Sequence, residues 1–149
     1  MSNEIIDKKK KEVLFTLTDG TEIKGEIHLW LYSTNRMGPQ RIDELLNEGT
    51  PFIPVKTVDG YILINSTHIM LARAEIEKNV HDLIMMGEKY SVHITTLLHK
   101  DLEADLFISL PEGFRRVKDY LDQQIQFFTF FQSEHILCIN RDFILSIRD

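Results

Sequence analysis

The side chains with the widest chemical repertoire in this sequence are six histidines and one cysteine. The histidines occupy positions 28, 68, 81, 93, 99 and 135. No two of them stand as His-x-x-x-His, the spacing that puts two imidazoles on one helix face to bind zinc. His28 and His93 fall on the polar faces of two predicted strands. We therefore predict no metal site.

Cys138 lies inside the apolar segment Ile136–Ile139. A reactive thiol needs partial exposure and a positively charged neighbour, and neither is evident here. Cysteine also packs well as a small hydrophobic residue, so we predict that Cys138 is buried and inert.

The sequence shows no Ser-His-Asp arrangement and no glycine-rich phosphate loop. Asp19-Gly20 and Asp59-Gly60 are turn sequences. We predict no catalytic residue and no cofactor, and we expect the chain not to be an enzyme.

Phe127-Phe-Thr-Phe-Phe131 is the most unusual segment of the chain. In a strand, Phe127 and Phe131 would point to one face, and Phe128 and Phe130 to the other. A strand that is apolar on both faces is usually covered on both, whereas exposed aromatic rings can stack on nucleic-acid bases. Since basic neighbours are lacking, the segment favours packing or a protein interface. Phe128 and Phe131 are candidates for an interaction surface.

The composition is that of a soluble globular protein. The 149 residues are 43% hydrophobic and 27% charged, and the apolar runs are far too short to span a membrane. The charged start of the chain does not resemble a signal peptide. A single cysteine cannot form an internal disulfide, which favours a reducing cytoplasm. The net charge of −6 disfavours nucleic acid as a partner, because phosphate binding needs a basic surface.

The chain contains an internal repeat. Placing residue 41 over residue 116 aligns 33 positions without a gap. Seven pairs are identical: Arg41/Arg116, Leu46/Leu121, Phe52/Phe127, Ile64/Ile139, Asn65/Asn140, Ile69/Ile144 and Arg73/Arg148. Upstream, Val13 aligns with Val92, and the loop 31–40 supplies four extra residues in the first copy. We predict two tandem copies of one unit at 12–74 and 88–149. The linker at 75–87 has roughly helical spacing, which favours a helix over a continuing strand and turn.

Each copy has the pattern of a small β-unit. In the first copy, alternating apolar residues predict two strands on either side of Asp19-Gly20, which fits a two-residue type I′ turn. Ile42, Leu45 and Leu46 are spaced for one face of a short helix. Two further strands, a turn at Asn65 and a last strand complete the unit.

Four repeated residues are predicted to be structural. Arg41 and Arg116 begin the short helix of each copy, where a buried or half-buried salt bridge shared by both copies explains them better than a ligand clamp. Asn65 and Asn140 suit a tight turn, because asparagine tolerates left-handed backbone and bonds to nearby amides.

The motifs resemble those of the Sm-like barrel. Phe15–Ile27 resembles the first Sm motif, a strand, an Asp-Gly turn and a strand with a central glycine. Ile136–Ile147 and Tyr61–Ala72 both resemble the second motif, a strand, a tight turn and the final strand. The resemblance covers about half of the chain and extends to SH3-like barrels. It implies a mainly β fold of two tandem five-stranded barrels, each with a short helix between its second and third strands, and association through strand edges that could build a ring.

The RNA-binding residues of that family do not carry over. Sm proteins bind RNA between their second and third strands and through an Arg-Gly pair before the fifth. Here the segment 31–47 fills the first place, and the second reads Asn65-Ser66 and Asn140-Arg141.

We therefore predict a non-catalytic interaction module that binds a protein partner or associates with itself. The alternative is an Sm-like protein that binds RNA or single-stranded nucleic acid. Besides Phe128 and Phe131, the candidate contact residues are Trp30, Tyr32, Arg36 and Arg115. Arg115 has no equivalent in the first copy and is therefore freer for a partner.

Overall fold

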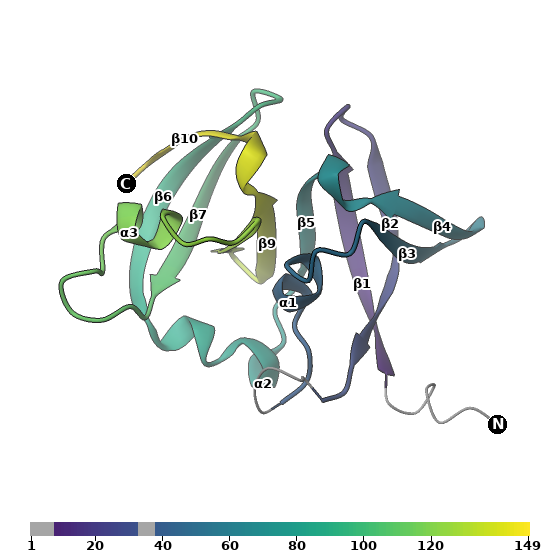
Figure 1. Cartoon of the computed structure of the whole chain (residues 1–149), viewed down its shortest axis with the longest axis horizontal. Helices are drawn as coiled ribbons and strands as arrows, with labels where there is room; N and C mark the ends of the chain where they lie inside the picture. Colours follow the sequence, from purple (N-terminus) through teal and green to yellow (C-terminus); the bar gives the residue numbers. More distant parts are fainter. Residues whose placement is uncertain (1–7, 33–37) are drawn as a thin grey trace.

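Strands dominate the computed structural model, which describes residues 8–32 and 38–149 (Figure 1). The first half of the chain contains β1 (Lys8–Leu17), β2 (Glu22–Trp30), β3 (Phe52–Thr57), β4 (Gly60–Asn65) and β5 (Ile69–Glu75). The second half contains β6 (Glu88–Thr96), β7 (Asp101–Ile108), β8 (Phe127–Gln132), β9 (His135–Asn140) and β10 (Ile144–Arg148). The prediction of a mainly β fold is confirmed.

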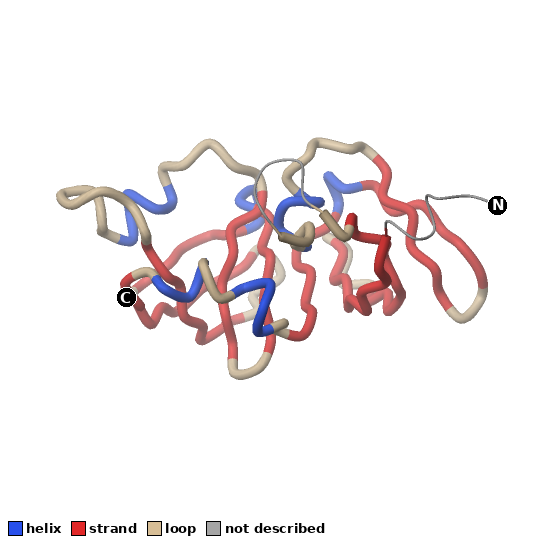
Figure 2. The backbone as a smooth tube through the Cα atoms, turned by 90° about the horizontal axis from the view of Figure 1, so that it is seen from below, coloured by secondary structure: helices blue, strands red, loops and turns tan. Residues whose placement is uncertain are grey.

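Short helical segments connect the strands (Figure 2). They are α1 (Ile42–Leu46), η2 (Ser66–His68), α2 (Lys78–His81), η3 (Ile84–Met86), α3 (Val117–Leu121) and η4 (Arg141–Phe143). The helices α1 and α3 lie between the second and third strands of each half, as predicted. The stretch 75–87 contains α2 and η3, so it is partly helical. No helix within the described ranges is long and apolar enough to cross a membrane.

All ten strands in the described ranges belong to one antiparallel sheet. Their order is β10-β6-β7-β8-β9-β5-β1-β2-β3-β4, and β9 and β5 lie side by side at the centre (Figure 1). The sheet is not closed, so the expected pair of separate closed barrels is not observed. Closing each barrel would require β5 to pair with β4, and β10 with β9. Instead β5 and β9 pair with each other.

The elements of the two halves occupy matching places. The bounds of α1, β3, β4 and η2 recur 75 residues later in α3, β8, β9 and η4. Strand pairing recurs as well: Val13 faces Gly25 in β1 and β2, and Val92 faces Ala104 in β6 and β7, 79 residues later. The pairing of β1 with β5 and of β6 with β10 is irregular at the same place. Below, residues related by these two offsets are called counterparts.

The first hairpin turn differs from the prediction. A type I′ turn needs positive φ at both central residues, but only Gly20 has it, at 89°. Asp19 keeps negative φ, and its side chain accepts a hydrogen bond from the amide of Thr21 at 2.9 Å. The connection is thus wider than two residues. In the second half, His99 adopts φ 57° in the corresponding turn without a glycine.

Two hydrophobic clusters form the core, and both draw on both halves of the chain. The first cluster is built on Val13, Phe15, Ile27 and Ile42, and the second on Val92, Ile94, Leu106 and Ile108. Each half supplies residues to the cluster of the other half. These residues meet where β5 pairs with β9, and we call this place the central junction.

Candidate interaction surface

The junction between the halves is an antiparallel pairing of β5 with β9. Leu71 faces Ile139, Ala72 faces Cys138 and Arg73 faces Leu137. This pairing satisfies backbone N–H and C=O groups that would otherwise lie unpaired along an edge of β5 and an edge of β9. The two halves therefore share one continuous sheet.

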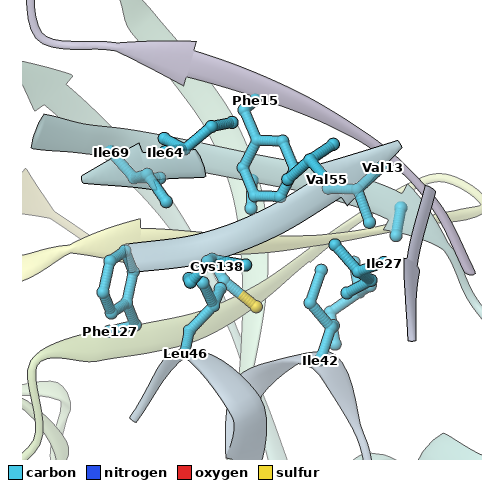
Figure 3. Packing of buried hydrophobic residues seen from close by; sticks show 14 of the residues in the cluster. Val13, Phe15, Ile27, Ile42, Leu46, Val55, Ile64, Ile69, Phe127 and Cys138 are labelled. Carbon is cyan, nitrogen blue, oxygen red and sulfur yellow. The ribbon is translucent and has the colours of Figure 1, made fainter. Parts of the chain in front are cut away.

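Side chains cross this junction in both directions. Phe127, Phe131, Ile136 and Cys138 of β8 and β9 belong to the first cluster, and Figure 3 shows Phe127 and Cys138 beside Leu46 of α1. In return, Met70 and Leu71 of β5 belong to the second cluster. Strand alternation sends successive side chains to opposite faces, so β8 and β9 can contribute to both clusters.

The Phe127–Phe131 segment is buried at this junction. Phe128 and Phe130 pack into the second cluster, while Phe127 and Phe131 pack into the first. The segment is apolar on both faces because both faces are covered. The prediction that Phe128 and Phe131 contribute to an interaction surface is wrong, since both are buried.

Polar side chains also bridge the junction. The Asn47 side chain accepts hydrogen bonds from the amides of Gln126 and Phe127, at 3.1 and 2.8 Å, and donates one to the Phe127 carbonyl at 3.1 Å. The buried Asn140 donates from Nδ2 to the Ile69 carbonyl at 3.0 Å. Its Oδ1 accepts from the amide of Asp142 in the turn η4.

Replacing Asn140 by alanine is expected to destabilise the fold by about 1–3 kcal/mol, because it leaves the buried Ile69 carbonyl without this donor. The matched variant Asn65→Ala should cost only about 0.5–1 kcal/mol. Its side chain accepts bonds from Thr67 in an exposed turn. Urea denaturation of both variants tests this, and equal losses would contradict the bridging role of Asn140.

The face of the β8–β9 hairpin that packs into the first cluster is buried, but the corresponding face of the β3–β4 hairpin is exposed to solvent. Phe52 is 52% exposed whereas its counterpart Phe127 is 2% exposed. Leu63 is 67% exposed although its counterpart Cys138 is fully buried. Tyr61, the counterpart of Ile136, is also exposed. We call Phe52, Tyr61 and Leu63 the β3–β4 patch.

Register places the patch residues on one face of the hairpin. Phe52 pairs with Asn65, Pro54 with Leu63, and Lys56 with Tyr61. Directly paired residues share a face, as do residues two apart along a strand. The exposed apolar side chains are therefore contiguous rather than scattered.

A groove in the second half is the counterpart of the surface that β8 and β9 cover in the first. It has a volume of about 440 Å³ and is lined by Tyr90, Val117, Leu121 and Ile147 together with the charged residues Arg116, Lys118 and Asp149. All four lining side chains are half-buried. We call these four residues the α3 groove.

In the first half, the counterparts of the α3 groove are Lys11, Ile42, Leu46 and Ala72, and all four are buried. Three of them belong to the cluster that receives Phe127 and Cys138. The α3 groove is thus open where the corresponding surface of the first half is filled.

The predicted contact residues do not form one site. Trp30 is partly exposed at the end of β2, with the Lys8 ammonium 4.5 Å from its ring centre. Tyr32 is exposed, and Arg36 lies outside the described residues. Arg115 stands in the other half, where its Nε donates to the Leu110 carbonyl at 2.9 Å.

The repeated residues have local structural partners. Arg41 pairs with Asp43 at 3.0 Å and Arg116 with Asp119 at 3.1 Å, each at the start of a short helix. Asn65 and Asn140 accept hydrogen bonds from the amides two residues later, in the turns η2 and η4. The Arg41 pair is largely buried, whereas Arg116 is 73% exposed, so the predicted burial is found only in the first half. Both asparagines have φ −67°, which is extended backbone rather than the left-handed conformation.

His81 in α2 is a buried titratable group beside the junction. Its Nδ1 accepts a hydrogen bond from the Glu77 amide at 3.0 Å, and its ring lies edge-on to Phe131. Burial lowers the pKa of His81, and the charges of Lys11 and Arg41 act in the same direction, whereas Asp43 and Glu77 oppose them.

Stability should therefore fall as the pH drops from 7 to 5. The unfolded chain protonates His81 near pH 6.5, whereas the folded chain resists protonation, so acid favours unfolding. His81→Asn, which keeps an acceptor near the Glu77 amide, should flatten this dependence. His99→Asn, in an exposed turn, is the matched substitution. The urea midpoint of each protein is measured at pH 7 and at pH 5. An equal fall of the midpoint in wild type, His81→Asn and His99→Asn would exclude His81 as the source of the pH dependence.

The remaining chemical candidates are not assembled into a site. Cys138 is buried as predicted, and burial raises the pKa of its thiol well above the ordinary value. Among the described residues, no three His, Cys, Asp or Glu side chains are grouped to hold a metal ion.

No protein-family model, no curated protein and no solved structure matches the chain.

The residues of the β3–β4 patch were not among the predicted contact residues. Their signal is the run Tyr61–Ile64, which is apolar at successive positions like the segment Phe127–Phe131. A strand that is apolar on both faces is usually packed against other elements on both faces, so this run indicates that β4 has a second apolar face for a partner.

Proposed function

We propose that this chain is a non-catalytic interaction module built from two divergent copies of one Sm-like β-unit. It binds protein through the β3–β4 patch and the adjacent free edge of the sheet. The matching element bounds and strand pairing support the two-copy interpretation. The single buried cysteine is compatible with the reducing cytoplasm that we propose for it.

One observation carries the proposal: Phe52, Tyr61 and Leu63 are exposed on a face whose counterpart is buried. Contiguous exposed apolar side chains mark interaction sites more often than isolated ones do. Aromatic residues such as Phe52 and Tyr61 are enriched in protein interfaces because they bury a large area at low entropic cost.

Protein is favoured over nucleic acid as the partner. The phenylalanines of β8, which could have stacked on bases, are buried. The net charge of −6 opposes phosphate binding. The patch is apolar, which suits another protein surface.

Affinity purification from the native host tests the proposal when wild type is compared with Tyr61→Lys/Leu63→Lys. The matched control is Leu83→Lys/Met86→Lys, which replaces two exposed apolar residues in and beside η3. We expect a protein that is retained by wild type and control, lost with the patch variant, and able to bind again as a purified component. Identical protein sets from all three baits would refute the patch as a binding site.

A further inference from the structure

We infer that the chain binds a small zwitterion, an α-amino acid with an apolar side chain, in a cavity beside the central junction. The cavity has a volume of about 570 Å³, which is within the usual range of small-molecule sites. Residues of β1, β2, β5 and β9 line it, so both halves of the chain contribute. None of the described residues that line it belongs to the β3–β4 patch, and the inference therefore goes beyond the proposed function.

Arg73 of β5 supplies the positive charge that we assign to the ligand. Its Nη2 donates to Oε1 of Gln132 at 2.8 Å, and Gln132 donates in turn to the Glu103 carbonyl at 2.9 Å. Within the described residues, the Nε of Arg73 is buried without a hydrogen-bond partner, and no acidic side chain forms an ion pair with the guanidinium. A guanidinium offers paired N–H groups that match the two oxygens of a carboxylate. Neutral groups thus position Arg73, and its charge can bind a carboxylate ligand.

Glu75 supplies the opposite charge on the same strand. Residues two apart in a strand point to one face at a spacing of about 6.6 Å, so Arg73 and Glu75 lie side by side along the cavity. Lys11 bonds to the backbone carbonyl of Glu75 at 2.7 Å, and no cation among the described residues pairs with the Glu75 carboxylate. An ionised carboxylate accepts hydrogen bonds from an ammonium group. A ligand that carries a carboxylate close to an ammonium group therefore complements both residues.

The other charged groups of the cavity favour a zwitterion over a phosphate. The ion pairs already formed there are Lys24–Glu12 at 3.1 Å and Lys11–Glu77 at 2.8 Å. In the described part of the chain, Arg73 and Lys10 remain as the cations of the cavity without an acidic partner. A phosphate dianion near them would also meet the carboxylate of Glu75, and like charges repel. The ammonium group of an amino acid makes the contact with Glu75 attractive instead.

Part of the cavity lining is apolar. Leu14 of β1 is half-buried and faces Arg73 in the strand register. Val13 and Ala74 also line the cavity. A ligand side chain that covers Leu14 loses contact with water, which favours binding when that side chain is apolar. We therefore expect leucine to bind more tightly than glycine.

The cavity depends on the pairing of β5 with β9. Gln132, which bonds to Arg73, and His135, which is paired with Glu75, belong to the second half of the chain. The counterpart of Arg73 is Arg148, which is exposed on the edge strand β10. Arg148 therefore offers a matched control position. Since the ligand binds the folded chain, it should also raise the midpoint of thermal unfolding.

Nuclear magnetic resonance of the isotope-labelled full chain tests the inference with three related probes. Leucine carries both charges, isocaproate lacks the ammonium group, and isoamylamine lacks the carboxylate. We expect leucine to cause saturable shifts of amides in β1, β5 and β9. Its dissociation constant should be at least about tenfold below those of the other two probes, because each of them loses one charged contact. Inorganic phosphate should not displace leucine.

Two variants separate the roles of the charged residues. Arg73→Gln should abolish the binding of leucine and of isocaproate. Glu75→Gln should weaken leucine binding about tenfold or more, while isocaproate binds as well as before or better. A residue with a merely structural role would not change the affinity for one probe alone. Arg148→Gln should bind leucine like wild type.

The absence of saturable shifts with leucine would overturn the inference. So would phosphate or isocaproate binding as tightly as leucine, which indicates a general anion site, or equal leucine affinity in Glu75→Gln and wild type. If Arg73→Gln does not fold, Arg73→Lys replaces it and should also weaken leucine binding, because lysine cannot form the paired contact. These measurements do not involve the β3–β4 patch, so their failure would leave the proposed function standing.

Discussion

Replacing Phe127 by alanine is expected to destabilise the chain by about 3–5 kcal/mol, the usual cost of removing a buried phenyl ring. Phe127 belongs to the second half but packs in the first cluster, so its loss should loosen the central junction. Thermal or urea unfolding at low protein concentration provides the measurement.

The matched control is Phe52→Ala, the same substitution at the counterpart position. Phe52 is exposed, so the expected cost to folding is below about 1 kcal/mol, as for most surface substitutions. The variant should instead weaken the binding of a protein partner to the β3–β4 patch. A loss of similar size in both variants would mean that the two hairpins are equally covered, contrary to the structure.

Replacing Met70 by lysine should destabilise the fold by more than about 4 kcal/mol, because it places an unpaired charge in the core. Met70 of β5 is fully buried and belongs to the second cluster. With a typical domain stability of about 5–15 kcal/mol, much of the protein should then be unfolded at moderate temperature. Circular dichroism and the urea midpoint report the loss.

Leu145→Lys places the same lysine at the counterpart position on the exposed edge. This variant should remain folded, with a change in stability within about 0.5 kcal/mol. A folded Met70→Lys protein would contradict the central junction. An unfolded Leu145→Lys protein would show that β10 is more deeply packed than its exposure indicates.

Local patterns predicted the strands well. Alternation of apolar and polar residues located β1 and β2 around Asp19-Gly20, and helical spacing located α1. These features depend on neighbours in the sequence, so local residues suffice to predict them. The turn type was wrong, because a wider connection lets Asp19 keep negative φ while accepting a hydrogen bond from Thr21.

The proposed interaction surface was predicted less well for a physical reason. Phe128 and Tyr61 are both aromatic residues in apolar strands, and neither sequence context reveals which one is covered. Phe128 is covered because β8 lies between two clusters, whereas Tyr61 lies near the edge of the sheet. Exposure of a strand residue depends on distant elements that pack against it.

The sequence by itself determined the repeating order of strands, turns and short helices, because periodicity and turn chemistry are local properties. Only the tertiary structure decided that the halves join through β5 and β9 into one open sheet. That choice depends on pairing between segments far apart in the chain, which local propensity does not encode. The pairing of β5 with β9 buries one face of the β8–β9 hairpin but leaves the corresponding face of the β3–β4 hairpin exposed. This difference in burial is the basis for the proposed function.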